Sequence, residues 1–308
     1  MMIVIKEIII TTVLTFVYAV AWSQSYIRPD HYWENPYLVS PAYINNQYIG
    51  IISAATRLQW INVAGAPKTM WLTGAYYLEE QHMQVGARII QDKIGYMNTS
   101  SVSLSYSYAA ILDENWRLDM GLAGSWQSIN YDQSKIVADN STDPSFADDF
   151  NNRNKLNADI GIELTSNKFK LGMAGQNLFG LWSGYSGIFP QTWLFYSSYR
   201  WFTENMVDCQ LGISQYFCGK WSQNELSVMA VFKKNERDNV QSDKFYAGLF
   251  YRHRYELGAT LGMNINSQLS LCYSYTYNNS AIKYNSVGSH QLMLTYRIKP
   301  KPPCHCNF

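Results

Sequence analysis

Apolar and polar positions alternate along this chain with a two-residue period, most clearly between residues 267 and 298. In the segment SQLSLCYSYTY, apolar and aromatic residues share one parity: Leu269, Leu271, Tyr273, Tyr275 and Tyr277. The other parity carries small polar residues, and HQLMLTYRI repeats the alternation up to residue 298. Because a β-strand points alternate side chains to opposite faces, the pattern predicts a hairpin with one apolar face.

The same alternation recurs upstream, and with the final hairpin it predicts about fourteen strands. Each candidate is close to the ~9–11 residues that a tilted strand needs to cross a bilayer. The upstream candidates are residues 48–60, 68–78, 83–89, 101–110, 116–127, 156–164, 168–177, 192–203, 207–217, 225–232, 244–252 and 255–264.

The apolar faces could lie against a second sheet, as in a soluble β-sandwich, or against lipid, as in an outer-membrane barrel. Only 15% of residues are charged, against about 25% in a typical soluble domain. The apolar parity holds many Tyr and Trp near strand ends, as membrane interfaces favour. The polar parity is rich in Ser, Gly, Ala, Thr and Gln, and it reads as small and neutral. These features favour the barrel.

The connections between candidate strands alternate between short and long. Short ones are residues 78–81, 112–115, 165–168 and 265–268, and long ones are residues 130–155, 178–191 and 278–289. Short periplasmic turns and long outer loops are typical of outer-membrane barrels. Because unpaired backbone groups are unfavourable in hydrocarbon, the first and last strands should pair. We therefore predict an all-β fold, a transmembrane antiparallel up-and-down β-barrel over residues 47–298.

The chain ends outside the barrel carry their own signals. Residues 1–23 have a lysine, an apolar run and an Ala-Trp-Ser site, which predicts a cleaved signal peptide over the alternative of an uncleaved helix. Residues 24–46 contain three prolines and are expected to be an extended lead-in, either periplasmic or plugging the lumen. Residues 299–308 are expected to be a periplasmic tail. The predicted location is the outer membrane of a Gram-negative bacterium.

Several short motifs occur in an order and spacing that resemble the PorP/SprF-like outer-membrane proteins of the type IX secretion system. The resemblance covers nearly all of the chain after the predicted signal peptide. It departs from the family pattern at Ser40, near Ile44, and at Gln291, where Glu is usual. The motif residues are Pro41, Ala42 and Tyr43; Arg57, Gln59 and Trp60; Gly65 and Pro67; Asp92 and Gly95; the Ser105–Ala109 strand; Tyr273–Tyr275; and Gly288, Ser289 and His290.

The resemblance implies a non-enzymatic role in secreting or anchoring cargo, including gliding adhesins. It also implies partners among other type IX components in the periplasm and outer membrane, besides the lipid bilayer. The alternative is a diffusion porin or small-solute channel. Porins carry charged constriction residues, and the neutral polar parity here favours the secretion role. The net charge of +1 gives no reason to expect a nucleic-acid partner.

A few residues could carry chemistry, and each has a simpler interpretation. Cys304 and Cys306, in the short cysteine-bearing tail that the resemblance also includes, could bind a metal, but they lack a second ligand pair, so a solvated tail or a disulfide is favoured. His290 has no G-x-S-x-G serine to act with, so packing at the strand start is favoured over catalysis. We expect no catalytic residues, metal or cofactor.

Two further groups have open interpretations. Arg57, Gln59 and Trp60 could form a contact surface or plug site, or they could line the end of the lumen beside an interfacial tryptophan. Four aspartates in one long connection could bind calcium, but their spacing is not that of an EF-hand, which favours a solvated loop. They are Asp139, Asp143, Asp148 and Asp149.

Overall fold

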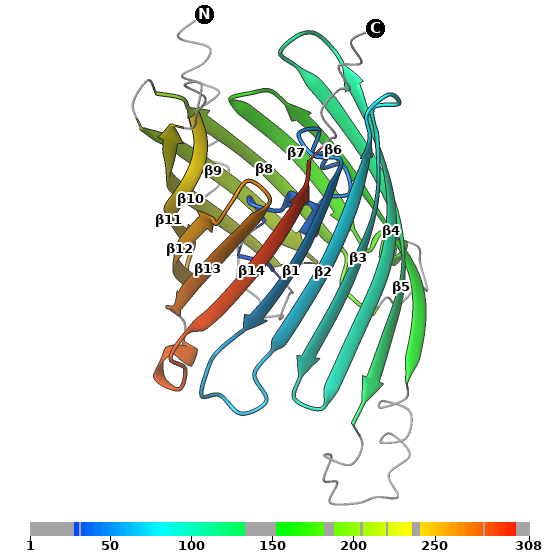
Figure 1. Ribbon diagram of the computed structural model, residues 1–308. Coiled ribbons are helices and arrows are strands. Elements are labelled where there is room, and N and C mark those ends of the chain that lie inside the picture. The colour runs from blue at the N-terminus through cyan, green and yellow to red at the C-terminus, as the bar shows by residue number, and fades with distance from the viewer. Residues whose placement is uncertain are drawn as a thin grey trace, which may run out of the picture.

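The computed structural model describes residues 28–30, 32–132, 152–181, 188–203, 206–219, 221–235, 241–279 and 281–299. Within them, fourteen antiparallel strands form one closed barrel (Figure 1). The strands are β1 Gly50–Leu58, β2 Lys68–Leu78, β3 Met83–Ile94, β4 Met97–Ile111, β5 Arg117–Tyr131, β6 Arg153–Thr165, β7 Phe169–Gln176, β8 Thr192–Trp201, β9 Val207–Cys218, β10 Trp221–Asn235, β11 Gln241–Arg252, β12 Glu256–Asn264, β13 Leu269–Asn278 and β14 Ser289–Ile298. Three short 3-10 segments accompany them: η1 Pro36–Leu38, η3 Leu178–Leu181 and η5 Ala281–Tyr284.

The barrel closes where the first strand meets the last. Strands β1 and β14 pair in an antiparallel register that runs from Gly50 opposite Ile298 to Leu58 opposite His290. Every other strand pairs with its two neighbours in sequence, so no sheet edge is left open. This confirms the predicted up-and-down barrel and its closure, which removes the unpaired backbone groups that hydrocarbon disfavours.

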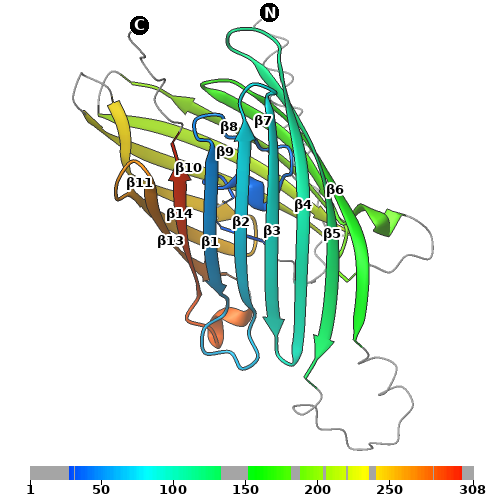
Figure 2. The same cartoon turned by 45° about the vertical axis from the view of Figure 1, so that its right-hand side comes forward.

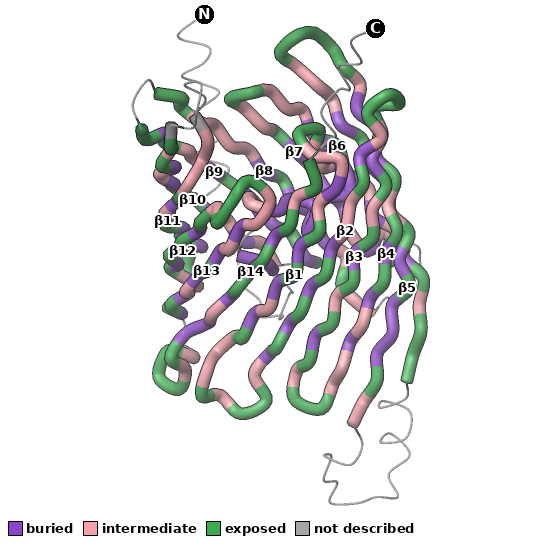
Figure 3. The backbone as a smooth tube through the Cα atoms, viewed as in Figure 1, coloured by how far each residue is buried: buried purple, intermediate pink, exposed green. Residues whose placement is uncertain are grey.

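Buried and exposed residues alternate along the strands, as Figure 3 shows. The outward parity is apolar, with Leu104 68% exposed, Leu122 64% and Leu156 63%. The inward parity is polar and buried. It is not neutral, however, and that expectation was wrong: buried inward side chains include Arg57, Arg88 and Glu225. These charges form pairs inside the barrel instead of lining an open constriction.

The two rims of the barrel differ in their connections (Figure 2). The long links after β5, β7 and β13 all leave one rim, and β1 begins and β14 ends at the opposite rim. Since outer-membrane barrels keep short turns in the periplasm, we call the rim with the long links the outer rim and the other the periplasmic rim. Outward aromatic side chains lie near both, including Tyr251 and Tyr277 near the outer rim and Tyr76 and Tyr296 near the periplasmic rim.

No helix in the described part of the chain is both long enough and apolar enough to span a membrane.

Several sequence predictions lie outside the described residues. They concern the signal peptide over residues 1–23, the four aspartates of the link after β5, and the tail thiols of Cys304 and Cys306. They stay predictions.

Candidate functional site: a plugged lumen

The segment before β1 lies inside the barrel. We call residues 28–30 and 32–46 the plug; it crosses the lumen behind β1 and β2 (Figures 1 and 2). Its middle is the most buried part, with Ser40 and Ala42 fully buried. Pro29, Pro36 and Pro41 prevent a regular helix or strand, so the chain can follow an irregular path across the lumen.

Apolar plug residues pack against inward apolar residues of the barrel wall. Leu38 and Val39 belong to one buried cluster with Trp71 of β2 and Leu194 of β8. The ring of Trp33 meets the ring of Tyr246 of β11 edge-on, with the ring centroids 5.4 Å apart. The plug therefore has a small hydrophobic core of its own within a largely polar lumen.

Glycines of the barrel wall make room for the plug backbone. A Cβ at Gly121 of β5 would overlap the carbonyl of Pro41, and one at Gly161 of β6 would lie 2.7 Å from Ser40 Oγ. Real Cβ atoms essentially never come this close to another heavy atom, so neither position can hold a larger residue unless something shifts. Beside them, Ser107 Oγ of β4 donates a hydrogen bond to the Pro41 carbonyl over 2.6 Å. The sequence thus places small residues on three adjacent strands where the plug passes.

Wall side chains also donate to plug carbonyls that burial would otherwise leave unsatisfied. Arg88 donates to the Leu38 carbonyl over 3.0 Å and pairs with Asp159 of β6 at 2.6 Å. Gln176 of β7 donates to the Val39 carbonyl over 2.9 Å, and Gln84 of β3 to the Tyr43 carbonyl over 2.7 Å. These bonds hold the plug backbone to β3 and β7.

Near the outer rim, Arg28 fixes the first described stretch of the plug to β9 and β10. Its guanidinium pairs with Glu225 at 2.8 Å and donates to Gln223 over 2.5 Å and Ser214 over 3.2 Å. It also stacks over the Tyr216 ring, 3.9 Å from the centroid. A guanidinium with planar donors suits this divided set of acceptors better than an ammonium would.

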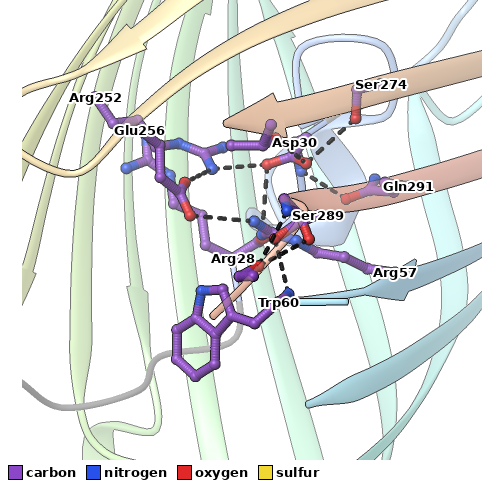
Figure 4. A network of polar contacts seen from close by, with 12 residues as sticks. Arg28, Asp30, Arg57, Trp60, Arg252, Glu256, Ser274, Ser289 and Gln291 are labelled. Atoms are coloured by element: carbon purple, nitrogen blue, oxygen red, sulfur yellow. Dashed lines mark hydrogen bonds and ion pairs between the residues drawn. The ribbon is translucent and has the colours of Figure 1, made fainter. Parts of the chain in front are cut away.

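Asp30 fixes the same stretch to the strands beside the closure (Figure 4). Its carboxylate lies 2.7 Å from Arg252 Nη1 and 3.4 Å from Arg57 Nη1, and it accepts from hydroxyls of β13. Its backbone N–H donates to Gln291 Oε1 of β14 over 2.8 Å. Arg57 also donates to the Arg28 carbonyl. One aspartate thereby joins the plug to β1, β11, β13 and β14.

The charges of this outer network balance. Three arginines face three carboxylates: Arg28, Arg57 and Arg252 with Asp30, Glu225 and Glu256. Arg252 contacts all three carboxylates, at 2.6–2.7 Å. Buried charges are tolerated when they are paired and hydrogen-bonded, and removing one partner is strongly unfavourable. The network therefore holds the plug in place and closes the lumen toward the outer rim.

Most of the predicted motif residues lie in one of two places. Pro41, Ala42 and Tyr43 belong to the plug, and Arg57 points inward to hold it. A second set of motif residues links the loops of the outer rim through hydrogen bonds. The bonds are Gln59 N–Pro67 O, Trp60 N–Ser289 Oγ, Gly95 N–Gly65 O and Ile61 N–Gly288 O.

All three glycines of that rim group adopt backbone conformations that favour glycine. Gly65 has a φ of 71°, Gly95 a φ of 58° and Gly288 a φ of 108°. A Cβ at Gly288 would also lie 2.8 Å from the Thr276 carbonyl. Arg57 binds the plug through its side chain, whereas Gln59 and Trp60 bond through their backbone N–H groups, to Pro67 and Ser289.

Asp92 and His290 lie apart from both groups. Asp92 is buried in the lumen and accepts a hydrogen bond from Thr69 Oγ1 over 2.5 Å. His290, near the start of β14, lies 2.6 Å from the Tyr273 hydroxyl and packs against the Tyr275 ring.

Sequence reasoning missed the other charged members of the outer network around Arg57. Arg28, Asp30, Glu225, Arg252 and Glu256 were not singled out. The available signal was a lone charged residue on the inward parity of a strand, as at Glu225 in NELSV.

Among the described residues, no group of three or more His, Cys, Asp or Glu side chains is placed to hold a metal ion. Cys209, Cys218 and Cys272 are free thiols.

A family model described as "Type IX secretion system membrane protein PorP/SprF" matches residues 21–296. The chain belongs to this family. Its barrel, its apolar outer face and its PorP/SprF membership place the protein in the outer membrane. Among curated proteins, no sequence matches the chain.

Solved structures with a similar fold include Omp33 of Acinetobacter baumannii, an outer membrane protein. It has a TM-score of 0.46 and 9% identity, and the match covers 82% of this chain and 98% of that one. The toluene transporter TbuX of Ralstonia pickettii has a TM-score of 0.48 and 9% identity, with coverage of 89% and 94%. The KdgM porin has a TM-score of 0.41 and 4% identity, with coverage of 80% and 99%.

Proposed function

We propose that this protein is a non-enzymatic component of the type IX secretion system. It assists the secretion or surface anchoring of cargo, such as gliding adhesins, through contacts with other proteins. Its signal peptide delivers it across the inner membrane, and its partners are other type IX components in the periplasm and outer membrane. The observation that carries the proposal, beside family membership, is the plug held across the lumen by buried ion pairs.

The plug argues against the alternative of a diffusion porin. A porin needs a continuous water-filled path, and here the outer half of the lumen is occupied by a segment of the chain itself. Arg28 and Asp30 contact strands on several sides of the barrel, and the wall glycines leave room for the plug backbone and no more. A barrel closed in this way acts through its surfaces.

Deletion of the gene from its own host tests the secretion role. We expect loss of surface display of at least one type IX cargo protein, measured by protease shaving of whole cells and mass spectrometry. Complementation with the full chain should restore display. Unchanged display of every type IX cargo in the deletion strain would refute the role.

Planar-bilayer conductance tests the channel alternative. The purified full chain should give no large steady channels, because the plug blocks the lumen. A variant that lacks residues 28–46, with its β-structure confirmed by circular dichroism, should give large channels. Large steady conductance from the unmodified protein would favour the porin.

A further inference from the structure

Between the plug and the periplasmic rim, the lumen widens into an open cavity of about 960 Å³. We call it the vestibule. Plug residues, among them Tyr32, Trp33 and Tyr43, form its inner end, and inward residues of the surrounding strands form its walls. The outer network, which includes Arg28 and Asp30 at the start of the plug, lies toward the outer rim, and the vestibule opens toward the periplasmic rim.

The vestibule is positively charged. Among the described residues that line it, eight are Lys or Arg and four are Asp or Glu. The whole chain carries a net charge of only +1, so this excess is local. A cavity lined by one sign of charge attracts ions of the opposite sign from solution.

The arginines and the lysines of the vestibule differ in their partners. Arg117 pairs with Asp119 at 2.7 Å, Arg200 with Asp243 at 2.6 Å, and Arg297 with Glu34 at 2.9 Å. Five lining lysines form no ion pair with any other described residue: Lys168, Lys170, Lys234, Lys244 and Lys299. Lys244 Nζ donates to the Asn264 and Ile265 carbonyls, and Lys170 Nζ lies 5.2 Å from the centroid of the Tyr43 ring. Because no described carboxylate pairs with any of the five, their charge is available to a ligand.

These lysines are spread along the part of the opening that β7 to β14 form. Lys168 and Lys170 lie at the start of β7, Lys234 and Lys244 lie on β10 and β11, and Lys299 follows β14. Strands β8 and β9 separate the first pair from the second, and β12 and β13 separate the second from Lys299. A ligand that meets all of them must carry several negative charges spread along its length.

The walls also offer groups suited to a polypeptide. Aromatic rings of Tyr48, Trp116 and Phe202 lie among the lysines and can pack against apolar side chains. Side-chain amides at the rim can bond to a peptide backbone, namely those of Asn46, Gln47, Asn115 and Asn167. A single phosphate would leave most of the volume empty, and the barrel wall separates the vestibule from lipid headgroups.

We propose that the vestibule is the docking site for an acidic, extended peptide segment of a protein partner that approaches from the periplasm. This rests on the proposed function, because it names the surface through which one partner is held. The segment enters along the barrel axis, its carboxylates meet the lysines, and its apolar side chains meet the aromatic rings.

The test uses the full-length protein in detergent micelles. The probes are two fluorescein-labelled peptides of equal length, one rich in Asp, Glu and Tyr and the other with Asn and Gln in place of the acids. We expect fluorescence anisotropy to show binding of the acidic peptide alone, weakening as salt is added because salt screens exposed charges. Equal binding of the two peptides, or no binding of either, would overturn the proposal.

Paired substitutions locate the site. Lys168→Gln with Lys170→Gln, and Lys234→Gln with Lys244→Gln, should each weaken binding by about tenfold, since each removes two solvent-accessible ion pairs with the peptide. The control is Lys68→Gln with Lys93→Gln, which makes the same charge change at the outer side, where both lysines are exposed. Affinity that falls equally in the control, or that is unchanged in both vestibule variants, would refute the site.

Soluble peptidoglycan fragments are the competing ligand. Fragments that displace the acidic peptide less well than unlabelled peptide support the proposal. Tight binding of fragments without binding of the peptide contradicts it. A vestibule that binds no peptide, in a strain where deletion still abolishes cargo display, refutes the docking site and leaves the secretion role. Peptide binding with normal cargo display after deletion refutes the secretion role instead.

Discussion

The two halves of the lumen use charge in opposite ways. Toward the outer rim, three arginines and three carboxylates are matched and bound to one another, and all of them are buried except Glu256, which is 13% exposed. Toward the periplasmic rim, cations outnumber carboxylates, and five lysines have no carboxylate partner among the described residues. The charges of the outer half bind other parts of the same chain, whereas the lysines of the periplasmic half can bind another molecule.

Solvent access explains the difference. A charge removed from water is unfavourable unless an opposite charge and hydrogen bonds replace the lost hydration, so the outer half must be matched from within. A lysine at an open mouth remains hydrated and can stay unmatched at little cost in stability. The comparison predicts that losing a charge in the outer half destabilises the fold, and losing one at the periplasmic mouth does not.

Asp30→Asn should have the largest effect. It removes the carboxylate that faces Arg57 and Arg252, whose side chains are 2% and 1% exposed, and leaves an excess of buried positive charge. We expect a loss of about 3–5 kcal/mol in the free energy of unfolding. The measurement is urea denaturation of the folded protein in detergent.

The matched control for Asp30→Asn is Glu114→Gln, an exposed carboxylate at the vestibule. It should change stability by no more than about 0.5 kcal/mol, as surface substitutions usually do. Equal losses from the two variants would remove the distinction between the halves.

Gly121→Ala should have an intermediate effect. The new methyl group would overlap the plug backbone at Pro41, so the plug or the β5 strand must shift, at about 1–3 kcal/mol. Gly124, on the same strand but facing outward, has nothing within 4 Å of a new Cβ. Gly124→Ala should therefore be neutral or slightly stabilising. Thermal unfolding of the two variants side by side checks this, and an equal loss in both would show that plug contact is not the cause.

Glu34→Gln should have the smallest effect, and it should depend on pH. Burial raises the pKa of the Glu34 carboxyl above its ordinary value of 4.5, although the Arg297 guanidinium beside it opposes the rise. A raised pKa in the folded state means that the group favours folding below pH 4.5, and that this contribution is lost as pH rises through the raised pKa.

The Glu34→Gln variant cannot lose a proton at this position. Its stability relative to the unmodified protein should therefore increase as pH rises above the ordinary value. Denaturation midpoints of both proteins over a pH series measure the trend. A difference that stays constant or reverses with pH would contradict the assignment of the shift to burial.

The sequence predicted the barrel well because its signal is local. Alternation along each strand, as at Leu118, Met120 and Leu122, reports which face meets lipid, and a closed sheet follows from the cost of an open edge in hydrocarbon. The site depends on contacts between residues far apart in sequence, such as Arg28 and Glu225 or Asp30 and Gln291. No periodicity encodes such pairs, and a few charges among many serines made the inward face look neutral.

The closure of the barrel has a consequence for assembly. Arg57 and Gln291, which both hold the plug, lie directly opposite each other on β1 and β14. Until these two strands pair, the bonds from Gln291 to Asp30 and from Arg57 to Arg28 cannot both form. Pairing of β1 with β14 and fixing of the plug are therefore one step, so a chain whose barrel has not closed does not yet have its plug fixed in place.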